Sequence, residues 1–230
     1  MLLNFVKNIF FKKNFLNFFT LSLIFLNFFG YFFHIKGNSE NSFIEILSAL
    51  FFFISFILCL YSIYKKKGVF IIILTILNFI FLCEETNWFQ VFFDYSIPVI
   101  ERLNSQNEIS IHNLYILRHG GIRGSNFNFR SLLDSQNLFR LFFFSFFFVI
   151  PYLNFRFDTL KKFLNKLGYI SPKLSLIIPL ILISTINLVL TTLVQHGTNA
   201  SSTLAEIREL MYAFFLFNYS YGYFHEIRFK

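Results

Sequence analysis

The sequence predicts an all-α fold, a polytopic transmembrane helical bundle of about six spans. Hydrophobic residues make up 56% of the 230 residues and charged residues only 14%, whereas a soluble domain carries about 25% charged residues. The hydrophobic residues also gather in long runs, and a helix needs about 20 predominantly apolar residues to cross a bilayer. We therefore expect a single integral membrane domain over residues 1–230.

Six segments have the length and composition of membrane spans, and each is expected to be helical because unpaired backbone groups are costly in hydrocarbon. The first segment contains Asn17 and Asn27, and the last begins near Glu206, Arg208 and Glu209. Such polar groups are expected to face other helices. The six predicted spans are residues 15–33, 43–64, 69–93, 138–155, 174–195 and 206–224.

The basic residues predict the orientation of these spans, because Lys and Arg in short loops tend to stay in the cytoplasm. With six spans, 13 of the 20 Lys and Arg residues fall on the side of the two termini, and the other seven fall on the opposite side. This bias predicts cytoplasmic N- and C-termini in a cell membrane of the bacterial inner-membrane type. The formal charge of +8 comes from short clusters beside the spans, which favours the lipid bilayer over nucleic acid as a partner.

One connection is much longer than the others. Residues 94–137, between the third and fourth spans, mix Pro98 with apolar pairs and polar residues. Loops longer than about 12–15 residues are usually functional or disordered, and this composition favours a structured outer cap of short helices or a re-entrant element. The predicted topology places this outer cap on the external face.

Two adjacent carboxylates, Glu84 and Glu85, lie inside the apolar run of the third span. A carboxylate in a membrane needs a partner, a proton or a water-filled cavity. In a helix, Glu84 and Trp88 would share one face, while Glu85 would point elsewhere. The alternative is a span that ends at Cys83, with both carboxylates solvated and Trp88 in the interfacial aromatic belt.

A second group of polar residues follows in the outer cap. In a helix, Glu108 and His112 would lie one turn apart, with His119 near the same stripe. A carboxylate that orients an imidazole, or that shares a metal with it, requires this approach. The same spacing is also typical of a solvated helix face. Together with the third span, this group makes Glu84, Glu85, Glu108 and His112 the candidates for catalysis.

Three histidines, His112, His119 and His196, map to the outer face and are the candidate metal ligands. Neutral imidazole is the commonest metal ligand, so a divalent metal such as zinc would suit this set. The chain contains neither H-x-x-x-H nor H-E-x-x-H, and His196 also fits a partner for the C-terminal dipole of the fifth span. Arg118 and Arg123 flank a glycine-rich turn that would bind an anion or act as a hinge.

The order of these polar residues resembles an uncharacterised family of bacterial multi-pass membrane proteins. Its members read roughly E-E-x-S-W-G-Q-R and then N-x-Q-x-E-x-x-x-H-N-L, and this chain reads EETNWFQ from residue 84 and NSQNEISIHNL from residue 104. Asn87, Phe89 and Val91 stand where Ser, Gly and Arg are usual, so a charge-pairing role of that Arg is in doubt. The resemblance names no reaction. It implies site residues that include Trp88, Gln90, Gln106 and Asn113, which with Arg118 and Arg123 are the candidates for substrate binding.

Three functions fit this arrangement. The first is a membrane-embedded enzyme for a lipid or lipid-linked substrate, with Glu85 or Glu108 as general base and His112 as metal ligand or acid–base partner. The second is a non-enzymatic subunit or assembly factor of a complex with other membrane proteins. The third, a transporter, is least favoured because the sequence has no repeat symmetry and no pair of broken helices.

Overall fold

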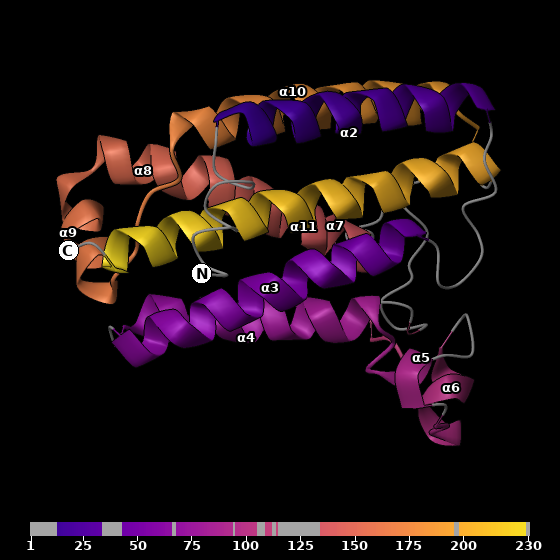
Figure 1. The fold of residues 1–230 in the computed structure, drawn as a ribbon, viewed down its shortest axis with the longest axis horizontal. Coiled ribbons are helices and arrows are strands. Elements are labelled where there is room, and N and C mark those ends of the chain that lie inside the picture. The colour runs from indigo at the N-terminus through magenta and orange to yellow at the C-terminus, as the bar shows by residue number, and fades with distance from the viewer. Residues whose placement is uncertain are drawn as a thin grey trace. The chain divides into compact units, whose positions relative to one another are not determined.

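The computed structural model describes residues 13–33, 43–65, 68–93, 95–104, 109–111, 114, 134–195 and 198–228. In these residues all regular elements are helical, which confirms the predicted all-α class (Figure 1). A π-helical turn, Ser145–Val149, joins α7 to α8. The helices are α2 (Lys13–Phe33), α3 (Phe43–Lys65), α4 (Val69–Glu85), α5 (Gln90–Phe93), α6 (Pro98–Leu103), α7 (Ser135–Phe144), α8 (Ile150–Arg156), α9 (Asp158–Leu167), α10 (Leu174–Leu193) and α11 (Asn199–Arg228).

Three of the described helical segments are long and apolar enough to cross a membrane: Phe43–Lys65, Asn137–Arg156 and Leu174–Leu193. They coincide with the second, fourth and fifth predicted spans. A shorter apolar helix, Leu16–Phe32, falls in the first. The third predicted span differs from the structure, because its helix ends at Glu85 rather than near residue 93. The local cause is a left-handed turn formed by Asn87, Trp88 and Phe89.

The chain forms two compact units, each built from segments that are far apart in the sequence. The first unit consists of Met1–Leu47 and Leu174–Phe215, and the second of Ser48–Lys173 and Leu216–Lys230. The beginning of α11 therefore belongs to the first unit and its end to the second.

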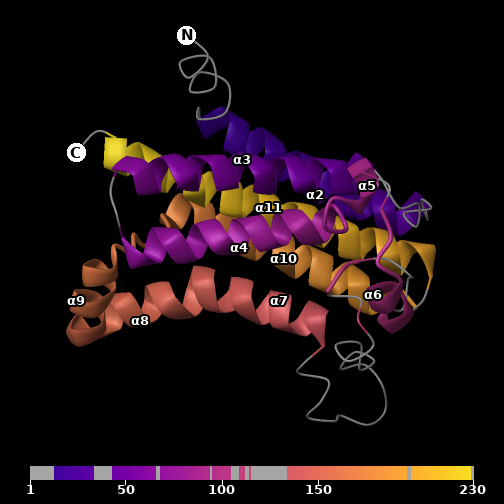
Figure 2. The ribbon, with the colours of Figure 1, turned by 90° about the horizontal axis from the view of Figure 1, so that it is seen from below.

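In the first unit, α2 and α10 lie side by side (Figure 1, Figure 2). Asn187 of α10 donates hydrogen bonds to Asn27 Oδ1 of α2 at 2.7 Å and to the Leu204 carbonyl of α11 at 2.9 Å. Both asparagines are buried, at 2% and 0% exposure for Asn187 and Asn27. Asn17 is exposed, so of the two asparagines in the first predicted span only Asn27 faces other helices.

In the second unit, aromatic rings pack around the end of α11 and around Tyr169, which follows α9. Phe146 lies 4.9 Å from Tyr219 and Phe70 lies 5.1 Å from Tyr169, measured between ring centroids. Tyr219 donates a hydrogen bond to the Ile170 carbonyl at 2.6 Å, and Tyr223 donates one to the Gly168 carbonyl at 2.9 Å. Burial raises the pKa of the Tyr169 phenol above its ordinary value. These contacts fix the connection between α9 and α10.

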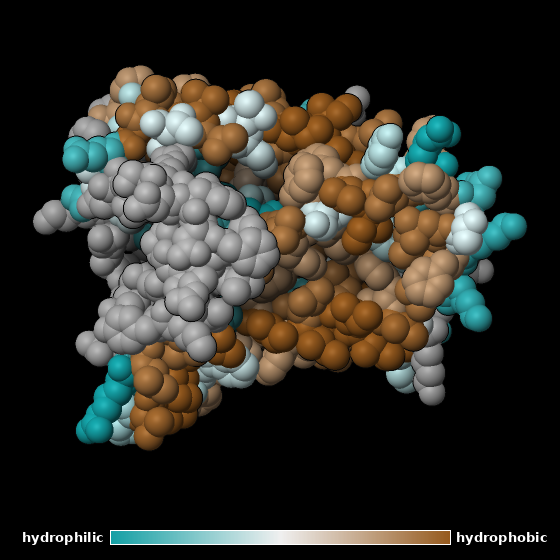
Figure 3. All heavy atoms as spheres, turned by 180° about the vertical axis from the view of Figure 1, so that it is seen from behind, coloured by the Kyte–Doolittle hydropathy of each residue, from teal (hydrophilic) through white to brown (hydrophobic). Residues whose placement is uncertain are grey.

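The long helices expose large apolar side chains, while their buried faces mix apolar residues such as Phe52 and Ile71 with small polar ones. The buried face of α3 includes Ser48, Ser55, Cys59 and Ser62, and α4 buries Thr75 and Asn78. The exposed positions of α3 are large and apolar, and the surface in Figure 3 is brown over much of its described area. These exposed side chains are Phe43, Ile46, Leu50, Phe53, Ile57 and Leu60.

We expect Asn187→Ala to lower the free energy of unfolding by about 1–3 kcal/mol, because it removes the donor to two buried oxygens. Equilibrium unfolding of the full chain in detergent measures this loss. Thr185→Ala is the matched control, since Thr185 is exposed on α10 and bonds to Ile181 of its own helix. Equal losses in the two variants would contradict the role assigned to the asparagine pair.

Candidate functional site

The candidate site lies in the second unit, at the end of α4. Of the predicted site residues, the structure describes Glu84, Glu85, Trp88 and Gln90. The remaining predicted residues lie outside the described part of the chain, and they are Gln106, Glu108, His112, Asn113, Arg118, His119, Arg123 and His196.

A left-handed turn ends α4. The φ angles of Asn87, Trp88 and Phe89 are 47°, 54° and 67°, although a left-handed conformation costs roughly 1–2 kcal/mol for each residue other than glycine. The Trp88 amide donates a hydrogen bond to the Cys83 carbonyl at 2.6 Å, and Thr86 Oγ1 donates one to the Leu82 carbonyl at 2.9 Å. Such strain persists only where surrounding contacts hold it.

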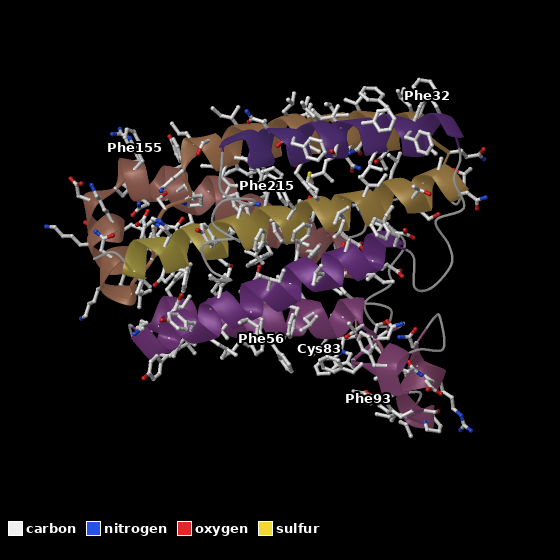
Figure 4. The ribbon with its side chains drawn as sticks, in the orientation of Figure 1. Phe32, Phe56, Cys83, Phe93, Phe155 and Phe215 are labelled. Carbon is white, nitrogen blue, oxygen red and sulfur yellow. The ribbon has the colours of Figure 1, made fainter. Side chains whose placement is uncertain are left out.

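Glu84 supplies one of these contacts. Its Oε1 atom accepts a hydrogen bond from Trp88 Nε1 at 2.7 Å and another from the Ile111 amide at 3.2 Å. Glu84 and Trp88 therefore meet, but through the left-handed turn rather than along one face of a continuous helix. Because Ile111 belongs to the outer cap, the carboxylate ties the cap to the end of α4. Figure 4 labels Cys83, beside Glu84, at this end of the helix.

Gln90 makes a second link between the turn and the outer cap. Its Nε2 atom donates to Glu101 Oε1 of α6 at 3.2 Å, and its Oε1 atom accepts from the Ile109 amide at 3.2 Å. Glu101 also accepts from Ser96 Oγ at 2.8 Å and from the Ile97 amide at 3.3 Å. Gln90 thus connects the start of α5 with two separate parts of the cap.

Glu101 and Asn104 are site residues that the sequence analysis missed. The signal for Glu101 is present locally, since Pro98 in the first turn of α6 and an acidic residue soon after mark a helix start. Asn104 donates to the Ser110 carbonyl at 2.7 Å, and both residues are almost fully buried. Asn104 also forms an isolated antiparallel bridge with Leu114. No local pattern identifies that pairing.

The arrangement uses carboxylates as acceptors for backbone and side-chain donors. The described residues contain no group of three or more His, Cys, Asp and Glu side chains placed to hold a metal ion. The three predicted metal ligands fall outside those residues, so the metal site stays a prediction. The geometry does provide a cap segment whose backbone amides are held at Ile109 and Ile111. In the sequence, Glu108 directly precedes this segment and His112 directly follows it.

We expect Glu84→Ala to shift the emission of Trp88 to the red and to increase its quenching by acrylamide, because the indole loses its acceptor. Trp88 is the chain's single tryptophan, so the signal is specific. The lost bonds to a charged group correspond to about 1.5–3 kcal/mol each. Glu84→Gln is the control, since its amide oxygen still accepts both bonds. Emission unchanged in Glu84→Ala would show that Glu84 does not hold the indole.

No protein-family model, curated protein or solved structure matches this chain. The resemblance of residues 84–90 and 104–114 to a family of bacterial membrane proteins therefore stays a prediction from the sequence pattern.

Proposed function

We propose that the chain is an integral protein of the cell membrane, crossed by six helices, with both termini in the cytoplasm. Three helices already have the length and composition of membrane spans. The apolar part of α2, together with α4 and α11, would supply the other three. The bias of Lys and Arg towards one side of this arrangement supports the orientation.

The apolar outer faces of the helices, together with the small polar residues between them, carry this proposal. In water, large apolar side chains are buried and small polar ones are exposed, whereas helices in a membrane pack through small and polar residues. Here Ser55 and Ser62 of α3 are buried, while Phe53 and Ile57 of the same helix are 48% and 46% exposed. An aqueous solvent would penalise this pattern, and a lipid solvent favours it.

We expect Ile181→Lys to impair membrane insertion, because a lysine near the middle of a span costs about 2.5–3.5 kcal/mol on insertion scales. Ile181 is 47% exposed in α10, and the same change on a water-exposed surface would alter stability by no more than about 0.5 kcal/mol. Resistance to alkaline extraction measures insertion. Ser175→Lys, at the exposed start of α10, is the control. Equal extraction of both variants and the unchanged chain would contradict a spanning α10.

Within the membrane, the chain acts as a non-enzymatic subunit or assembly factor of a larger complex. The supporting observation is that Glu84 and Glu101 each accept hydrogen bonds from two or more groups of the turn and the outer cap. Such carboxylates hold a surface segment in a defined conformation. A preformed segment of this kind lowers the ordering cost of binding a partner.

An enzyme that acts on a lipid or lipid-linked substrate is the second candidate. Three successive left-handed residues, Asn87, Trp88 and Phe89, favour it because backbone strain clusters at active sites. Glu85, half-buried beside this turn, or Glu108 would then act as the general base. His112 would bind a metal or transfer the proton.

We expect the tagged full chain, purified in mild detergent, to carry another membrane protein at a fixed ratio, measured by native mass spectrometry. Glu84→Ala should reduce the recovery of that protein, while Glu84→Gln should not, because only the first change releases the outer cap. A chain that is recovered alone, with a bound divalent metal that His112→Ala removes, would contradict the subunit role and support the enzyme.

A further inference from the structure

Helix α9 is amphipathic, although it is too short and too charged to cross a membrane. Its apolar residues Leu160, Phe163, Leu164 and Leu167 recur with the spacing of one helix face. The opposite face carries the three lysines of the helix together with Asp158 and Asn165. These lysines are Lys161, Lys162 and Lys166, and all three are exposed.

Exposed aromatic side chains lie on this helix and in the residues directly before it. Phe163 is 56% exposed on α9 itself, and Phe157, just before the helix, is 54% exposed. Phe155 and Tyr152 of α8 are 87% and 63% exposed. Figure 4 labels Phe155. Exposed aromatic rings beside lysines are typical of segments at the boundary between lipid and water.

The chain holds α9 close to two apolar helices. Only Phe157 separates α9 from Arg156, the end of the apolar segment Asn137–Arg156, and a short connection leads from α9 to α10. Gly168, at φ 84°, ends α9, and the Tyr169 amide donates back to the Leu164 carbonyl at 3.0 Å. Tyr223 then binds the Gly168 carbonyl. These hydrogen bonds hold the end of α9 against α11 within the second unit.

We propose that α9 lies in the plane of the cytoplasmic membrane surface, with Phe163 in the acyl-chain boundary and Lys161, Lys162 and Lys166 on anionic lipid headgroups. The inference rests on the proposed membrane function and adds a lipid-binding surface to it. The positive charge of the three lysines favours anionic lipid as the partner, since each lysine near an anionic leaflet contributes to the binding free energy. A helix with Lys on one face and Phe on the other is suited to such an interface.

The test compares two positions of α9 in the full chain, reconstituted in vesicles of phosphatidylcholine and phosphatidylglycerol. Single cysteines replace Phe163 or Asn165 in a background with Cys59→Ala and Cys83→Ala, and each carries a nitrobenzoxadiazole label. We expect several-fold stronger quenching by nitroxide-labelled phosphatidylcholine at position 163 than at position 165, because only position 163 faces the lipid. Both native residues are exposed, so the label does not disturb the core.

Replacement of the three lysines by glutamine should bring the quenching at position 163 close to that at position 165, while Arg102→Gln on exposed α6 should change neither. Equal quenching at the two positions in the unchanged chain, or no effect of the lysines, would overturn the lipid-binding role of α9. Protein that does not float with the vesicles would instead contradict the proposed membrane function.

Discussion

In the proposed membrane setting, a lipid-facing exterior would offer polar groups no partner, so a buried polar group gains stability from a partner inside the protein. The pair of Asn27 and Asn187 follows from this constraint, as do the hydroxyl groups of Thr20, Thr75 and Thr191, each bonded to a carbonyl of its own helix. Apolar side chains can then occupy the outer faces. The small inner residues let helices approach, as at Gly30, where an added Cβ would lie 3.1 Å from Thr203.

The end of α4 meets the same constraint where the helix stops. The last turn of a helix leaves carbonyl groups without partners, and the left-handed turn returns the Thr86, Asn87 and Trp88 amides to carbonyls of α4. Glu84 and Gln90 then satisfy amides of the outer cap. One set of hydrogen bonds therefore ends the helix, offsets the backbone strain and holds the cap.

The two proposed interaction sites differ in how they meet their partners. The outer cap presents backbone fixed by buried polar contacts, such as Asn104 with Ser110, which suits recognition of a protein surface. Helix α9 presents exposed lysine side chains, which suit anionic headgroups.

The sequence by itself determined the all-α class and the positions of the apolar helices, because long apolar runs and helical periodicity are local properties. It also selected Glu84, since a carboxylate in an apolar run needs a partner, while Gln90 was implied by the resemblance to a membrane-protein family. Only the tertiary structure decided that α4 ends at Glu85 and that Glu84 binds Ile111. It also decided the pairing of Asn27 with Asn187. These features depend on hydrogen bonds between distant segments and on a left-handed turn without glycine, and neither has a local sequence signal.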